Sequence, residues 1–304
     1  MSDQQRHGII VGVDGSASSL AAVEWAARDA AMRNVALTVL HVVAPIVTGA
    51  QGWPGVPVTA DYVELQEEQT ARIVEQANAA AVAAAPSHAD QMGYEVVYEP
   101  VLPALVEFSR QAEMMVVGCR GQGGVAQTLL GSVSVGVVHH AHCPVAVIHH
   151  HQPGAGPDPT GPVLVGVDGS PTSELATEIA FDEASRRGVE LVALHAWSDM
   201  NSLGMASIGW APIEWRNIKD QETEVLAERL CGWHDRYPDV VVHKVVVCDQ
   251  PALRLLEHAE KAQLVVLGSH GRGGFPGMLL GSVSTAVVNS AHIPVIVARL
   301  PRTD

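Results

Sequence analysis

Lysine is scarce in this chain of 304 residues: it occurs at three positions, and none of them precedes residue 219. A Walker-type phosphate loop requires lysine in the pattern GxxxxGK[ST], which is absent. Schiff-base chemistry and lysine-assisted phosphoryl transfer are therefore excluded from the first half of the chain and disfavoured in the second. The GxSxG elbow of serine hydrolases is also absent.

Cysteine and long apolar runs are equally limited. No apolar run reaches about 18 residues, so we expect no membrane insertion, and the N-terminal "MSDQQRHGII" lacks the layout of a signal peptide. The four cysteines form no CxxC pair, which argues against a disulfide framework or a zinc site. We expect reduced thiols and a cytoplasmic protein. The cysteines are Cys119, Cys143, Cys231 and Cys248.

Basic residues are outnumbered by acidic ones, 18 to 33, which gives a formal net charge of −15. The excess is spread along the chain: residues 1–152 carry 14 acids and 6 bases, and the remainder carries 19 and 12. Nucleic-acid binding normally needs a basic patch, so no nucleic-acid partner is expected. An anionic ligand would have to be held by local groups rather than by the overall field.

An internal repeat organises the sequence. "VGVDGS" begins at residue 11 and again at residue 165, an offset of 154. "GCRGQGGVAQTLLGSVS" at 118–134 is matched by "GSHGRGGFPGMLLGSVS" at 268–284, an offset of 150. Proline and glycine are frequent between the copies. The pattern predicts two domains, residues 1–150 and 161–304, joined by a linker at 151–160.

Each copy alternates short apolar runs with helical patterns, which predicts an α/β fold with a parallel sheet and right-handed crossovers. We expect two tandem Rossmann-like units, each with a five-stranded parallel sheet in the order 3-2-1-4-5, flanked by helices. In the first copy the predicted strands are 8–14, 36–43, 94–100, 114–118 and 144–149, and the predicted helices are 20–33, 62–85, 103–112 and 132–141.

The glycine-rich segments follow the fourth predicted strand, and an aspartate follows the first. Both therefore lie at the carboxyl edge of the sheet, where ligands bind in such folds. Glycine permits close approach to a ligand, and a helix that starts at Gly131–Ser132 offers unpaired N–H groups and a favourable dipole to phosphates. Arg120 and Arg272 would add charge. A tight turn with glycines needed only for packing is the alternative.

Asp14 and Asp168 end the first strand of each copy. Their carboxylates would accept hydrogen bonds from ribose hydroxyls, as acidic residues do in dinucleotide folds, or would cap the following helix. The residues alone favour neither use. Ser16, Ser18 and Ser19 are further candidates for the helix cap in the first copy.

Both glycine-rich segments match the G-x2-G-x9-G-S/T signature, and the chain resembles the ATP-binding universal stress proteins of the tandem, mycobacterial type. The resemblance includes "VGVDGS", "LHV" or "LHA" at the end of the second strand, and "AHCPV" or "AHIPV" before the fifth. It covers nearly the whole of both copies. Neither copy departs from the signature.

The resemblance implies ATP as ligand, with Mg²⁺, and assigns residues to it. The aspartates would meet the ribose, the backbone at the end of the second strand would meet adenine, and the glycines and serines would line the ribose and phosphates. The residues are Asp14, Gly15, Val42, Gly118, Arg120, Gly121, Gly131, Ser132, Val133 and Ser134 in the first copy, and Asp168, Gly169, Ala196, Gly268, His270, Gly271, Arg272, Gly281, Ser282, Val283 and Ser284 in the second.

The resemblance also implies a role. It predicts a nucleotide-dependent regulator of a stress or dormancy response, with one ATP site per domain, acting as a homodimer with a regulatory protein partner. No set of catalytic residues can be named. A slow ATPase or phosphotransferase, and a partner-binding module that needs no nucleotide, remain open alternatives.

A cluster of histidines and one cysteine at residues 139–151 is reminiscent of metal ligands. These residues are divided among a helix end, a strand end and the linker, so we interpret them as structural or solvated and expect no metal site. Cys119 lies in the glycine-rich segment, but its counterpart is Ser269, which disfavours a role in sensing oxidants.

Overall fold

The computed structural model describes residues 8–45, 60–121, 130–150, 156–197, 212–272 and 279–300. It divides into two compact units, Met1–His150 and His151–Asp304. The first part of the predicted linker, 151–155, lies outside the described residues, as do the central parts of the two glycine-rich segments, 122–129 and 273–278.

The first unit contains a parallel sheet of five strands in the order β3-β2-β1-β4-β5, as predicted. β1 lies in the middle, with Ile9 opposite Leu37 of β2 on one side and Met114 of β4 on the other. The central strands are buried on both faces, which explains their unbroken apolar sequences. The strands are β1 Ile9–Val13, β2 Leu37–Val42, β3 Met92–Val97, β4 Met114–Gly118 and β5 Val145–Ile148.

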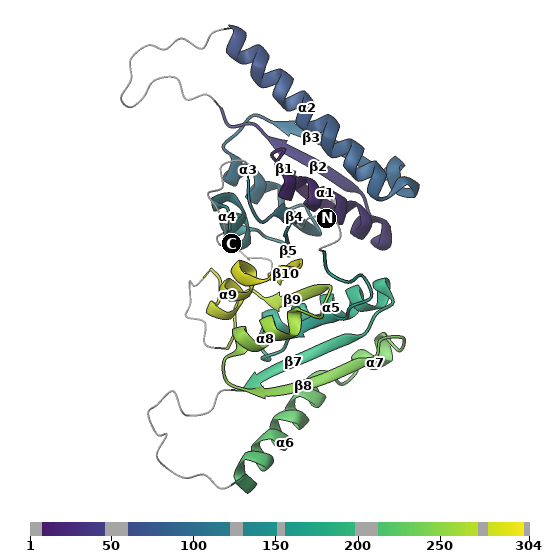
Figure 1. Ribbon diagram of the computed structural model, residues 1–304, viewed down its shortest axis with the longest axis vertical. Coiled ribbons are helices and arrows are strands. Elements are labelled where there is room, and N and C mark those ends of the chain that lie inside the picture. Colours follow the sequence, from purple (N-terminus) through teal and green to yellow (C-terminus); the bar gives the residue numbers. More distant parts are fainter. Residues whose placement is uncertain are drawn as a thin grey trace, which may run out of the picture. The chain divides into compact units, whose positions relative to one another are not determined.

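Helices cover both faces of this sheet (Figure 1). α1 packs against α2 on one face, and α3 packs against α4 on the other. Ser16 caps the start of α1, and Asn34 ends that helix in the left-handed conformation. The helices are α1 Ala17–Arg33, α2 Ala60–Ala84, the 3-10 helix η1 Pro86–Gln91, α3 Val101–Phe108 and α4 Ser132–His140.

The second unit repeats the arrangement with its sheet in the order β8-β7-β6-β9-β10. This order corresponds strand for strand to that of the first unit. The strands are β6 Val163–Gly166, β7 Leu191–Trp197, β8 Val242–Cys248, β9 Leu264–Gly268 and β10 Val295–Ala298; the helices are α5 Pro171–Arg187, α6 Pro212–Arg229, α7 Trp233–Arg236, α8 Pro251–Ala259 and α9 Ser282–Ser290.

An ion pair is built into the helix that follows the first strand of each unit. Asp29 and Glu183 have side chains with 0% exposure and accept from Arg33 and Arg187 at 2.7 Å. Each arginine lies one turn further along the same helix, so the carboxylates are buried with their partners. No helix among the described residues is long and apolar enough to cross a bilayer.

Candidate functional site

The carboxyl edge of the first sheet is shaped by the turn between β1 and α1. Gly15 has φ +81°, a conformation that favours glycine. Ser16 is the helix cap, with its Oγ accepting from the Ser19 N–H at 3.2 Å. Asp14 is therefore not the cap, because its Oδ1 instead accepts from the backbone N–H of Ser16 at 3.0 Å.

The second unit builds the same turn from matching residues. Gly169 has φ +77°, and Asp168 Oδ1 accepts from the Ser170 N–H at 2.9 Å. Ser170 caps α5 by accepting from the Ser173 N–H at 3.2 Å. The capping alternative for the aspartate is wrong in both units, and the carboxylate is instead fixed beside the start of the helix.

Hydroxyl groups on the first turn of α1 and α5 hold the glycine-rich segment in place. Thr172 Oγ1 donates to the carbonyl of His270 at 2.6 Å, and Ser170 Oγ donates to it at 3.0 Å. In the first unit the hydroxyls of Ser16 and Ser18 donate in the same way to the carbonyl of Arg120. The segment after the fourth strand is thus tied to the turn after the first.

Gly118 and Gly268 are required by packing. A Cβ on Gly118 would lie 2.6 Å from the Ser18 carbonyl carbon, and one on Gly268 would lie 2.7 Å from Thr172 Oγ1. Both distances are too short for real contacts, so these glycines let the helix start lie directly on the end of the strand. At these two positions packing within the protein is enough to explain the glycine, and no ligand is needed for that explanation.

Gly121 and Gly271 face the aspartate. A Cβ on either would lie 2.5 Å from the Oδ2 of Asp14 or Asp168. In the second unit that oxygen also accepts from the Arg272 N–H at 3.1 Å. The aspartate therefore bridges the two loops of the site, and a side chain at the glycine would displace it.

Gly131 and Gly281 differ from the other glycines. Each has an extended conformation open to any residue, with φ −62° and −73°. A Cβ would find its nearest neighbours at 3.5 Å in both units, which is ordinary van der Waals contact. Neither backbone conformation nor packing within the described residues requires glycine at these two positions.

The helix starts that follow these glycines lack a side-chain cap in both units. Gly131 itself donates its N–H to the Cys119 carbonyl at 2.8 Å, and Gly281 donates to Ser269 at 2.7 Å. The N–H groups of the next turn, beginning at Ser132 and Ser282, have no acceptor within the helix. A helix start whose N–H groups have no acceptor within the helix favours the binding of an anion.

The serines of the signature do not behave alike. Ser132 and Ser282 are exposed at the helix start. Ser134 and Ser284 are buried, and their hydroxyls donate to the carbonyls of Gly118 at 2.7 Å and Gly268 at 2.6 Å. The hydroxyl protons of Ser134 and Ser284 therefore join the helix to the strand in this structure, and their placement beside the phosphates stays a prediction.

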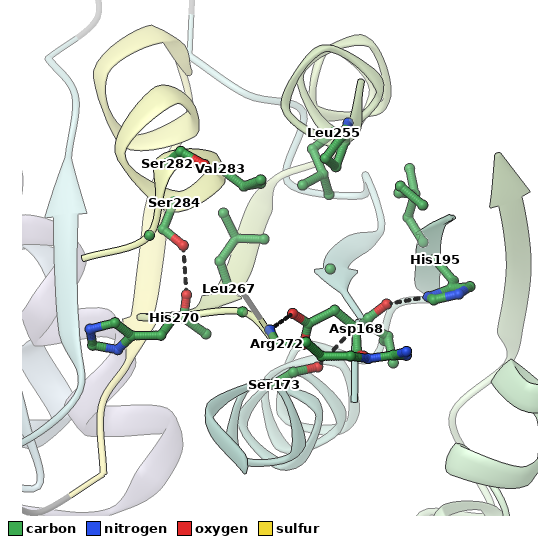
Figure 2. Close-up of a pocket in the computed structure, with 18 of the residues that line it drawn as sticks. Asp168, Ser173, His195, Leu255, Leu267, His270, Arg272, Ser282, Val283 and Ser284 are labelled. Atoms are coloured by element: carbon green, nitrogen blue, oxygen red, sulfur yellow. Dashed lines mark hydrogen bonds between the residues drawn. The ribbon is translucent and has the colours of Figure 1, made fainter. Parts of the chain in front are cut away.

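A pocket of about 720 Å³ opens at this edge of the second unit, and Figure 2 shows the residues around it. This volume falls in the range typical of small-molecule sites, about 300–1,000 Å³. Most of the residues predicted in this unit line it. They are Asp168, Ala196, Gly268, His270, Gly271, Arg272, Gly281, Ser282, Val283 and Ser284.

Gly169 is not among the lining residues, because the guanidinium of Arg229 from α6 lies against it. Arg272 is exposed, and its Nε donates to the Asp168 carbonyl. The His270 ring points away from Asp168 in Figure 2, and its Nδ1 lies 3.0 Å from Ser269 Oγ. The charged groups of the loop are therefore engaged mainly with the protein itself.

In the first unit the corresponding residues occupy matching places. Val42 is half-buried at the end of β2, as Ala196 is near the end of β7. Arg120 is exposed, and its carbonyl rather than its side chain is held by the serines of α1. Val133 lies half-buried in the first turn of α4.

Several lining residues were not predicted from the sequence. His195 is 3% exposed and lies at the end of β7, and Glu222 reaches the pocket from α6. The recurrence of "LH" at the end of the second strand in both copies was an available signal for His195. No comparable pattern marks Glu222. The remaining unpredicted residues with large side chains are Leu194, Trp197, Pro251, Leu255 and Leu267.

The histidine-rich segment does not assemble into a site where the structure describes it. Among the described residues, no group of three or more His, Cys, Asp or Glu side chains is placed to hold a metal ion. His151 lies outside the described residues. Cys119 and Cys143 are buried, Cys231 is exposed and Cys248 is intermediate.

Comparison with known proteins identifies relatives over the full chain. The model of the universal stress protein family matches residues 6–149 and 160–299. A universal stress protein of Mycobacterium tuberculosis is 59% identical over 317 residues, covering 99% of this chain and 98% of the relative. Another from the same species is 52% identical over 302 residues, covering 97% and 98%.

A solved structure supports the fold. The crystal structure of a universal stress protein from Archaeoglobus fulgidus is similar with a TM-score of 0.65 at 23% identity, and the match covers 99% of both chains. The fold is thus shared with that protein over the whole chain.

Proposed function

The chain belongs to the universal stress protein family, and we propose that each of its two units binds one molecule of ATP with Mg²⁺. The observation that carries the proposal is the pair of uncapped helix starts at Gly131 and Gly281. Ser, Thr, Asp, Asn and Gly are the preferred residues at such positions, and of these only glycine supplies no side-chain acceptor for the first N–H groups. Both copies carry glycine, although the protein's own packing leaves space for a Cβ.

We propose that a phosphate group lies beside these glycines, at the start of each helix. A side chain there would project over the N–H groups of the first turn and cover them. Glycine leaves them accessible, and the helix dipole adds a favourable potential for negative charge. Ser132 and Ser282 stand exposed at the same point and offer hydroxyl donors.

The charge of the protein bears on the role of Mg²⁺. The chain has a net charge of −15, and carboxylates of Asp168 and Glu222 line the pocket of the second unit, called the second pocket below. Mg²⁺ characteristically binds phosphates together with water and few protein ligands. We propose that it accompanies ATP as the counter-ion of the phosphates, which lowers the charge that the site must accept.

We propose that occupancy by ATP, rather than its turnover, is the signal. Both oxygens of the Asp168 carboxylate accept from backbone N–H groups, and Arg272 donates to a backbone carbonyl. Groups engaged in holding the loops are poorly suited to activate water or to move with a transferring phosphoryl group. The regulatory role in a stress or dormancy response, the homodimer and the regulatory protein partner belong to this proposal, as does a cytoplasmic location.

Nucleotide released from the purified, denatured protein tests the binding proposal. We expect ATP in the supernatant, together with slow or no phosphate release when excess ATP is added to the native protein. Steady turnover with saturation kinetics would favour the ATPase alternative. Protein that contains no nucleotide and fails to bind added ATP would favour a module that works through partners alone.

A further inference from the structure

His195 lines the pocket of the second unit, and both of its ring nitrogens are engaged. Its Nδ1 lies 2.6 Å from the carbonyl oxygen of Val167, the residue before Asp168. A carbonyl only accepts, so Nδ1 carries a proton and donates it. This bond fixes the plane of the ring, and the 3% exposure of His195 leaves it little freedom to turn.

The other ring nitrogen orients an acidic side chain. His195 Nε2 lies 2.9 Å from Glu222 Oε2, so one proton joins the two atoms. The Glu222 side chain is 30% exposed and lines the pocket. Its second oxygen has no hydrogen-bond partner among the residues that the structure describes. Glu222 therefore presents a fixed acceptor to the pocket.

The first unit keeps the histidine but pairs it differently. His41 Nδ1 lies 2.8 Å from the Val13 carbonyl, as in the second unit. Within the described part of that unit, the His41 ring makes no bond to a carboxylate. The oriented carboxylate is thus a feature of the second pocket.

The two ends of the second pocket have opposite character. The start of α9, at Ser282 and Val283, favours an anion, whereas Glu222 disfavours one and attracts hydrogen-bond donors. In Figure 2 the labelled residues of α9 lie on the opposite side of the pocket from His195. A nucleotide with its phosphates at α9 would thus direct its base or sugar toward the end with Glu222.

We propose that Glu222, positioned by His195, accepts a hydrogen bond from the exocyclic amino group of the nucleobase and so makes the second pocket selective for amino-bearing bases such as adenine. The inference rests on the proposed function, since it assigns a binding partner at the non-phosphate end of the same pocket. A site that offers an oriented acceptor discriminates against an analogue that lacks the donor, because the acceptor loses its partner.

The test compares ATP with purine riboside triphosphate, which lacks only the 6-amino group. Titration calorimetry is done on the full chain carrying Gly131→Glu, so that the second pocket alone is measured. We expect ATP to bind roughly tenfold more tightly than the analogue. Adding Glu222→Ala should bring the ratio close to one. Glu224→Ala, on the same helix at an exposed position, should leave the ratio at its original value.

The outcomes separate this inference from the proposed function. A preference for ATP that survives Glu222→Ala would overturn the role of Glu222 while leaving ATP binding established. Equal affinities for ATP and the analogue when Glu222 is intact would also overturn the role of Glu222 and leave ATP binding established. If neither nucleotide binds the parent chain, both the proposed function and the role of Glu222 are wrong. Circular dichroism confirms that Glu222→Ala is folded, and Glu222→Gln serves as a second variant if it is not.

Discussion

The glycines of one signature occupy positions that place different physical requirements on the residue. Gly118 is needed because α1 starts directly on it, and Gly121 because the Asp14 carboxylate lies over it. Gly131 has no such cause within the described protein. All three glycines belong to one signature, so the sequence predicted the same use for each. Only the distances from a Cβ built at each position distinguish a glycine required by packing from one left for a ligand.

Alanine substitutions should separate these causes. We expect Gly118→Ala to destabilise the first unit by about 1–3 kcal/mol, because its Cβ would overlap the backbone of Ser18. Gly131→Ala should leave the free energy of unfolding nearly unchanged but weaken ATP binding, because its methyl group would intrude on the phosphates. Urea unfolding and calorimetry measure the two effects.

Each of the two substitutions has its own result that would contradict the prediction. Equal stability of Gly118→Ala and the parent would show that the close approach of α1 is not maintained in solution. ATP affinity unaffected by Gly131→Ala would remove the main support for placing phosphate at the start of α4. Gly121→Glu is a poorer probe, because its side chain would displace Asp14 and lose binding by an indirect route.

Among the elements, α5, the helix after the first strand of the second unit, carries two kinds of ion pair at neighbouring positions. In α5, Arg187 pairs with Glu183, whose side chain is 0% exposed. Arg186 pairs with Asp182, which is 21% exposed and can be solvated. The same element thus offers a buried pair and its partly solvated counterpart for comparison.

Removing each arginine should have unequal effects. Arg187→Met removes the guanidinium that pairs with the buried Glu183 carboxylate, and we expect a loss of roughly 3–5 kcal/mol in unfolding free energy. Arg186→Met should cost less than about 1 kcal/mol, because water reaches Asp182. Chemical denaturation of both variants checks this. Equal losses would show that Glu183 is solvated or has another partner sufficient to stabilise it.

The main elements could be predicted from the sequence, because continuous apolar runs and helical periodicity are strong signals. The fourth strand was predicted at 114–118 and observed there. The short helices η1 and α7 were not predicted, since helices of so few residues carry little periodicity. The third strand was predicted at 94–100 but runs from Met92 to Val97, because its exposed, edge-like sequence gives no clear boundary.

At the scale of the whole molecule, the candidate site could be predicted only in part. Loop residues that follow the first and fourth strands were found, because parallel topology brings those strand ends to one edge. Glu222 was not, because α6 reaches the pocket through tertiary packing that leaves no local pattern. The interaction of Ser134 with the Gly118 carbonyl was missed for the same reason.

The net charge of −15 should influence how fast ATP arrives. The field of the chain repels an anion, and salt screens that repulsion over a Debye length of about 10 Å at 0.1 M. We therefore expect the association rate constant of ATP to rise with ionic strength at fixed Mg²⁺. Stopped-flow measurements with a fluorescent ATP analogue test this. A rate that falls with salt would indicate a local positive field that dominates.

We propose that both units bind ATP through the helix starts at Gly131 and Gly281. Isothermal titration calorimetry with ATP and Mg²⁺ on the nucleotide-free parent, Gly131→Glu and Gly281→Glu tests it directly. The glutamate would place a carboxylate over the N–H groups of the helix start, while the backbone at either glycine accepts any residue. We expect two sites in the parent and one in each variant. A parent with one site that a single variant abolishes, or two sites that survive both substitutions, would contradict it.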